Sequence, residues 1–319
     1  MSLSYRLLGV FLSLFIYSSH AVAQTATAEL VGNVSDTSGA AVPQAKITIT
    51  NAATGTVTRE LQTDEAGSYT ATLLPPGSYT ITVEKPAFRK LVQTGLSLET
   101  NQRARVDLTL QVGQVSETIE VQASAPLIES QSSSLGSVVT SKFVNELPLN
   151  GRNFVQLATL TPGVNGTGSS VGGTIMSGTR PDDRRPASEI FSNGNRENSN
   201  NFLYDGVDNN DRLTLSIVLR PGVEAIREFK VQTNMFSADQ GRNSGAVVDV
   251  ISKSGTNELH GSAFEFLRNS AMDARNFFNP RGTRFPPFRF NQFGFSLGGP
   301  VTIPKLYSGR NKTFFFVDY

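Results

Sequence analysis

Aromatic residues alternate with small or polar residues from residue 261 onward, and this pattern constrains the fold more than any other. Phe264 and Phe266 share one side of an extended segment, and Phe293, Phe295 and Leu297 share one side of another. A period of two predicts β-strands with one apolar face. Outward apolar faces rich in aromatic residues are typical of transmembrane barrel strands. The core of a soluble sandwich is the alternative.

The last segment, residues 311–319, is apolar on both sides until Asp318 and has no turn or cap before Tyr319. A strand that ends in this way leaves an open edge, which folded proteins avoid. Three strands cannot close a barrel or satisfy their edges in lipid. We therefore expect residues 256–319 to be the first strands of an incomplete transmembrane barrel, in a fragment or a truncated product.

The first 23 residues have the form of a secretory signal peptide. Arg6 precedes a short apolar run over residues 7–17, and a small-x-small site at residues 21–23 predicts cleavage between Ala23 and Gln24. The apolar run is short for a membrane span. An uncleaved anchor helix is the alternative, and because the cleavage site is well formed we expect the mature chain to be exported.

Residues 25–112 predict an all-β sandwich of about seven strands. Alternation is clear over residues 45–50, 79–84 and 105–110, and turn signals rich in Gly, Asp and Pro separate these segments. The chain has no Cys, so a disulfide framework is excluded.

Residues 113–135 are predicted to be a linker that carries one short β-prone segment, with polar low-complexity sequence after it. Such a segment can add as a strand to the sheet edge of a partner, because main-chain hydrogen bonds supply the affinity. The last strand of the sandwich and a plain linker are the alternatives. The segment comprises Glu117, Thr118, Ile119, Glu120, Val121, Gln122 and Ala123.

Residues 136–255 predict a small, heavily looped α/β unit that would bury little core if it stood alone. Pro162 and Gly163 end the second expected helix, and a long loop follows over residues 164–200. Short helices are expected at 141–147, 152–160 and 223–228, and strands at 201–207, 229–232 and 246–252.

The successive units of the chain resemble two known families. Residues 32–39, 63–69 (TDEAGSY) and 74–79 (LPPGSY) resemble the carboxypeptidase regulatory-like family, which implies a transthyretin-like or carbohydrate-binding-like sandwich. Residues 147–154 (LPLNGRNF) and 236–257 resemble the plug domain of TonB-dependent outer-membrane receptors, in the Oar-like branch that carries such a sandwich. In that family, a segment like 117–123 is the TonB box, which implies partner binding there.

Little in the sequence predicts catalysis. The net charge of +1 does not indicate nucleic-acid binding. Without Cys, and with His20 in the signal peptide, His260 stands alone, so no zinc site can be built and we expect a loop role for it. Asp205, Asp208 and Asp211 do not match a calcium loop, so a solvated turn is expected and calcium is the alternative. No enzyme activity, cofactor or metal is expected.

The resemblance implies the front portion of an outer-membrane transport receptor. A TonB-like periplasmic protein would pull on residues 117–123 and open the plug to an unknown substrate. The sandwich would lie in the periplasm, where it could bind glycans weakly, and the barrel would contact outer-membrane lipid. The alternative is an exported surface adhesion or carbohydrate-binding protein built on a Cna-B-like sandwich.

Overall fold

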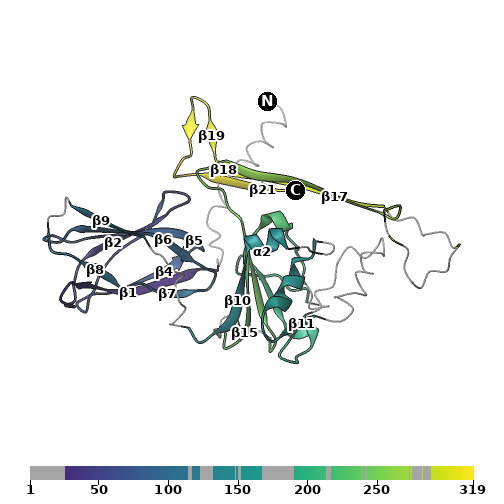
Figure 1. Ribbon diagram of the computed structural model, residues 1–319, viewed down its shortest axis with the longest axis horizontal. Coiled ribbons are helices and arrows are strands. Elements are labelled where there is room, and N and C mark those ends of the chain that lie inside the picture. The colour runs from purple at the N-terminus through teal and green to yellow at the C-terminus, as the bar shows by residue number, and fades with distance from the viewer. Residues whose placement is uncertain are drawn as a thin grey trace, which may run out of the picture.

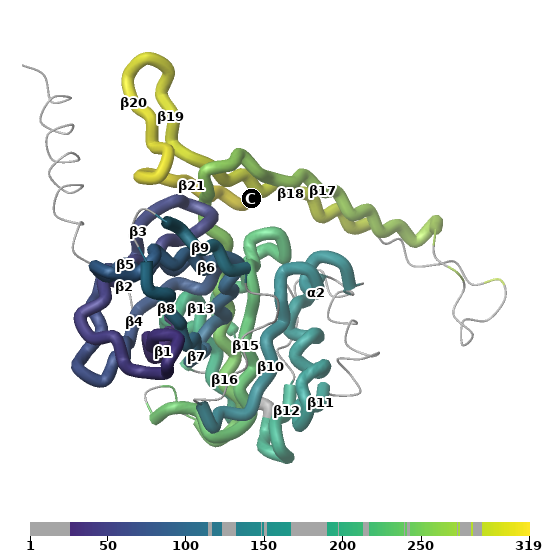
Figure 2. The backbone as a smooth tube through the Cα atoms, turned by 60° about the vertical axis from the view of Figure 1, so that its left-hand side comes forward, coloured from purple at the N-terminus to yellow at the C-terminus, as the bar shows by residue number. Residues whose placement is uncertain are grey.

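The structure is a computed structural model of the 319-residue chain. It describes residues 26–113, 117–122, 132–147, 152–166, 190–212, 217–238, 243–272 and 289–319, with residues 149, 240, 274 and 282. The expected signal peptide and its cleavage site lie outside the described residues. The fold is mainly β, and its strands form an N-terminal sandwich, a middle unit and a set of C-terminal strands (Figures 1 and 2).

The N-terminal sandwich packs two sheets face to face. In one sheet β1 lies between β4 and β7 and also pairs with β8, and the other has the order β3-β2-β5-β6-β9. The strands are β1 (Ala28–Asp36), β2 (Lys46–Asn51), β3 (Val57–Gln62), β4 (Ser68–Leu74), β5 (Gly77–Glu84), β6 (Lys90–Leu98), β7 (Arg103–Arg105), β8 (Leu108–Leu110) and β9 (Thr118–Gln122).

The alternation predicted from the sequence places the core of this sandwich. Ile47, Ile49 and Ile81 are fully buried between the sheets, while the residues between them face outward or lie at the margin. The buried Tyr69 hydroxyl donates to the carbonyl oxygen of Val106 at 2.8 Å, so its polar end is satisfied inside the core.

The middle unit is built on a five-stranded sheet with the order β10-β15-β16-β13-β14. Its strands are β10 (Leu135–Thr140), β13 (Asn201–Tyr204), β14 (Val207–Asp208), β15 (Ile226–Asn234) and β16 (Val247–Ser252), and a separate pair is formed by β11 (Val164–Gly166) and β12 (Ile190–Ser192). Helix α2 (Ser141–Glu146) is flanked by the 3-10 helices η2 (Phe154–Leu160), η5 (Glu197–Ser199) and η6 (Val223–Ala225).

Most expected elements of the middle unit are present, with two corrections. The expected helix over 152–160 is a 3-10 helix that begins at Phe154, after the side chain of Asn153 caps the amide of Val155. The expected helix over 223–228 ends at Ala225, because strand β15 begins at once and its alternating residues Phe229 and Val231 enter the core. Strand pairing therefore overrides the local helical preference.

The C-terminal strands form an antiparallel sheet with the order β17-β18-β21. Its strands are β17 (His260–Asn269), β18 (Arg289–Pro300) and β21 (Phe314–Asp318), and β19 (Thr302–Ile303) pairs with β20 (Tyr307–Ser308) in a separate hairpin. Within the described part of the chain, helices are too short or too polar to cross a membrane.

The register of β17 and β18 places their aromatic residues on opposite faces of the sheet. Phe264 pairs with Gly294, so its side chain lies on the face opposite to Phe293 and Phe295. Gly294 makes room for this ring, because a Cβ there would lie 2.7 Å from the Phe264 ring. Phe264 and Phe266 therefore turn toward the middle unit, and only the stripe on β18 points away from it.

Candidate functional site

The β-prone segment after the sandwich forms strand β9, which joins the sandwich sheet as its last strand. It runs parallel to β6, with Thr118 opposite Lys90 and Gln122 opposite Thr94. This is the first alternative left open by the sequence, and Ala123 lies outside the described residues. Figure 2 shows β9 next to β6 in the sandwich.

Strand β9 pairs with β6 alone and keeps its other sheet edge open. Ile119 packs against the sandwich core, and Arg89 Nε lies 2.7 Å from Glu117 Oε2 in a half-exposed ion pair. The amide of Lys90 donates to the Glu117 oxygen, so in this register the main chain of Thr118 and Glu120 turns to the other edge. No described strand pairs with that edge. A five-residue strand of this kind is available for strand addition.

The chain runs from β9 to β10, the edge strand of the middle sheet. Strand β10 pairs antiparallel with β15, from Leu135 opposite Asn234 to Thr140 opposite Glu228. Gly136 lies close against β15, because a Cβ there would be 2.4 Å from the Val231 oxygen.

Arg152 joins the middle unit to the C-terminal strands. Its guanidinium forms a buried ion pair with Glu224, and both side chains are little exposed. Its Cζ atom also lies 4.3 Å from the Phe264 ring centroid and 4.4 Å from that of Phe266. A cation that is desolvated and stacked in this way fixes the position of β17 against η2 and η6.

Two further charges surround this contact. Lys253 and Asp318 both lie near enough to Glu224 to interact with it electrostatically. Asp318 also interacts electrostatically with Arg152. A Cβ at Gly222 would lie 2.8 Å from a carboxylate oxygen of Asp318, so β21 turns this side chain toward the middle unit. Sequence reasoning missed Arg152 and Glu224 as a pair, because 72 residues separate them.

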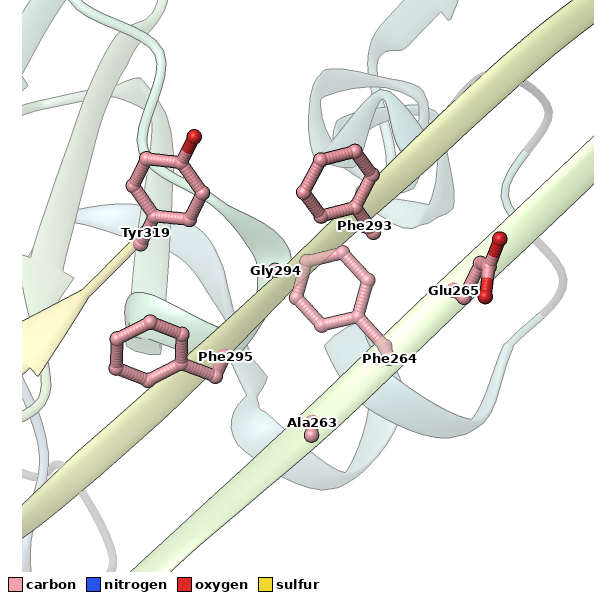
Figure 3. A pocket seen from close by; sticks show the side chains of 7 residues that line it. All are labelled: Ala263, Phe264, Glu265, Phe293, Gly294, Phe295 and Tyr319. Atoms are coloured by element: carbon pink, nitrogen blue, oxygen red, sulfur yellow. The ribbon is translucent and has the colours of Figure 1, made fainter.

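An open hollow lies among the aromatic residues of the C-terminal strands (Figure 3). The Phe295 and Tyr319 ring centroids are 6.1 Å apart, and Phe293 is well exposed. Glu265 is the charged residue among those that line the hollow. A shallow apolar surface with so few converging polar groups has the character of a packing face rather than of a catalytic pocket.

The acidic residues near position 208 are used structurally. Asp205 accepts hydrogen bonds from the amide and hydroxyl of Ser252, each at 2.8 Å, and Asp208 accepts from Asn210. Across the residues that the structure describes, no group of three metal-ligating side chains occurs. His260 begins β17, where its ring contacts Thr256 and the Glu258 oxygen.

Comparisons with known proteins match both ends of the chain. Residues 29–111 match the carboxypeptidase regulatory-like domain, and residues 251–319 match an outer membrane beta barrel domain. The TonB-dependent transporter Oar of Myxococcus xanthus is 26% identical over 307 residues, which are 92% of this chain and 27% of the relative. The chain thus spans about a quarter of the length of that curated relative.

Solved structures give partial matches. The siderophore receptor PirA from Acinetobacter baumannii is 26% identical over 52% of this chain and 22% of its own, with a TM-score of 0.35. Hydroxyquinol 1,2-dioxygenase from Pseudomonas putida is 12% identical over 29% of this chain and 59% of its own, with a TM-score of 0.24.

The sandwich, the barrel-domain strands and the match along 92% of the chain relate this protein to the TonB-dependent proteins of the outer membrane. The chain is similar along 92% of its length to the TonB-dependent transporter Oar, and it carries a carboxypeptidase regulatory-like domain. Its location is the cell outer membrane.

Proposed function

We propose that this chain is the gating portion of a transport receptor, and that residues 117–123 couple it to a TonB-like periplasmic protein. The middle unit acts as the plug, the C-terminal strands belong to the barrel wall, and the sandwich lies in the periplasm. The observation that supports this most is the placement of β9: an edge strand with one open side, which is followed along the chain by β10, the edge strand of the middle sheet.

The coupling works by strand addition at the open edge of β9. The partner strand pairs with the main chain of Thr118 and Glu120, while Ile119 stays anchored in the sandwich core. Force on β9 then reaches β10 and loosens it from β15, beginning at Leu135. An edge strand that opens from one end yields one hydrogen bond at a time, so a small force suffices.

Catalysis is not part of the proposal, because no constellation of nucleophile, base and oxyanion donors is assembled among the described residues. The adhesion alternative is less well supported. It explains the sandwich alone, whereas the similarity to Oar extends along the chain and includes the residues of the barrel-domain match. No comparison supports glycan binding by the sandwich.

The experiment measures binding of the purified C-terminal domain of the TonB-like protein to the intact receptor in detergent. Glu120→Pro removes a main-chain donor at the open edge, and we expect it to weaken binding by at least about tenfold. Glu120→Ala keeps that donor and serves as the matched control, with affinity close to wild type.

Ile119→Pro separates two forms of the coupling. In this register the main chain of Ile119 turns toward β6, so Ile119→Pro loosens β9 from β6 but removes no donor at the open edge. A partner that adds at the open edge should therefore tolerate the substitution. A partner that takes β9 after it leaves β6 would lose affinity with either proline variant. Equal binding by wild type and all three variants would refute the assignment of residues 117–123.

A further inference from the structure

One face of the middle sheet carries charged side chains that are almost completely buried. Glu228 and Lys230 on β15 are 8% and 3% exposed, and Asp249 on β16 is 1% exposed. Lys230 and Asp249 stand directly opposite each other in the antiparallel ladder. Charges withdrawn from water to this degree need hydrogen-bond partners.

Their partners come from the N-terminal sandwich, at the turn over residues 99–102 between β6 and β7. The amide of Thr100 donates to Glu228 Oε1 at 2.7 Å, and the Thr100 hydroxyl donates to the same oxygen. Asn101 Nδ2 donates to Asp249 Oδ2 at 3.1 Å, and Lys230 Nζ donates to the Asn101 carbonyl oxygen at 3.2 Å. Thr100 and Asn101 of the sandwich thus form hydrogen bonds with all three buried charged side chains.

A second contact joins the turn between β2 and β3 of the sandwich to Asn257, which follows β16. The amide of Asn257 donates to the Ala53 oxygen at 3.1 Å, and Asn257 Nδ2 donates to the Thr54 oxygen at 2.7 Å. The buried apolar cluster of the sandwich and that of the middle unit share no residue. A polar contact between separate cores is the kind that can open without unfolding either side.

We propose that the N-terminal sandwich is a detachable clasp on the middle unit. In the closed state the 99–102 turn covers the charged face of the sheet and holds Glu228, Lys230 and Asp249 away from water. In the open state the sandwich swings away as a folded body and exposes these side chains. The clasp also fixes where β9 stands relative to β10, so it sets the starting geometry of the coupling segment. It does not depend on the identity of the periplasmic partner.

Lys230 reports the open state, because an amine-reactive ester can reach it only when the clasp opens. Labelling is followed by mass spectrometry in the intact protein in detergent, with the exposed Lys142 as the reference amine. Thr100→Val with Asn101→Gly removes two clasp donors, and Gly accepts the left-handed backbone of Asn101, whose φ is 52°. Lys230 labelling should accelerate about 10- to 100-fold.

Thr109→Val is the matched control, because Thr109 is exposed on β8 and lies outside the clasp contacts. It should leave Lys230 labelling at the wild-type rate. Amide exchange of Val248, in the buried core of the sheet, distinguishes clasp opening from unfolding. Exchange that stays slow while Lys230 labelling rises supports the clasp, and a parallel rise in both overturns it.

A reversible lock provides the opposite perturbation. The chain has no cysteine, so Ala53→Cys with Asn257→Cys introduces a single pair at a backbone hydrogen bond. Oxidation should slow Lys230 labelling by at least about tenfold, and a reductant should restore it. Identical labelling in the oxidised and reduced forms would show that the contact does not open. If wild-type Lys230 is labelled as fast as Lys142, the clasp does not close over it.

Discussion

Replacement of Arg152 by Met should loosen the middle unit from the C-terminal strands. Met keeps an unbranched apolar side chain but removes the charge that pairs with Glu224 and stacks over Phe264 and Phe266. Breaking a buried ion pair by removing one partner costs about 3–5 kcal/mol, because the remaining charge stays desolvated.

Two features adjust this magnitude. Each cation–π contact adds about 0.5–2 kcal/mol when it is desolvated. In the other direction, Lys253 lies near Glu224 and compensates part of its charge after Arg152 is lost. We expect a net loss of about 3 kcal/mol in the free energy that holds η2 against β17.

The measurement is urea-dependent hydrogen exchange on the intact protein in detergent, read at the amides of Phe154–Leu160. A double-mutant cycle with Glu224→Gln isolates the pairwise energy, and a coupling of about 2–3 kcal/mol is expected. Arg105→Met is the control, because the Arg105–Asp107 pair is 44% and 55% exposed and its loss should cost much less than the loss of the Arg152–Glu224 pair.

The reasoning is refuted if Arg152→Met costs no more than Arg105→Met. It is also refuted if the cycle gives no coupling between Arg152 and Glu224, since the proposed role of Arg152 depends on that pair.

Two further predictions concern the middle sheet. Burial raises the pKa of Asp249 from 3.8 to about 6, helped by Asp205 and Glu228 and opposed by the Asn101 hydrogen bond. Protonation therefore favours the closed clasp: this contribution, about 3 kcal/mol at most, is full below about pH 4 and is lost as the pH rises through about 6. Exchange of the Thr100 amide, corrected for intrinsic rate, should accelerate over that range in wild type and stay flat in Asp249→Asn. Gly136→Ala should cost about 1–3 kcal/mol and speed amide exchange in β10, because its Cβ would lie 2.4 Å from a β15 carbonyl oxygen, and an unchanged rate would contradict the contact.

Much of the architecture follows from the period-2 pattern of the sequence. Ile47, Ile49 and Ile81 were expected on one apolar face and are buried there. Helix α2 lies where a Thr or Ser cap preceded a short apolar pattern, although Thr140 makes no side-chain capping bond. These features are local, so the residues themselves specify them.

The features missed by the sequence are long-range. The direction of Phe264 depends on its register against Gly294, which periodicity within one strand does not specify. The Thr100–Glu228 contact joins residues 128 positions apart, and neither segment has a sequence pattern that predicts the other as its partner. The sequence left three interpretations of the segment that forms β9, because its pairing depends on whether the β6 edge is available.

The most direct test of the proposed coupling is hydrogen exchange of the intact receptor with and without the C-terminal domain of the TonB-like protein. The account predicts that the partner slows exchange at the Thr118 and Glu120 amides, which turn to the open edge of β9, and speeds exchange at the start of β10 near Leu135. Binding that leaves residues 117–122 unchanged, or that protects a different segment instead, would contradict it.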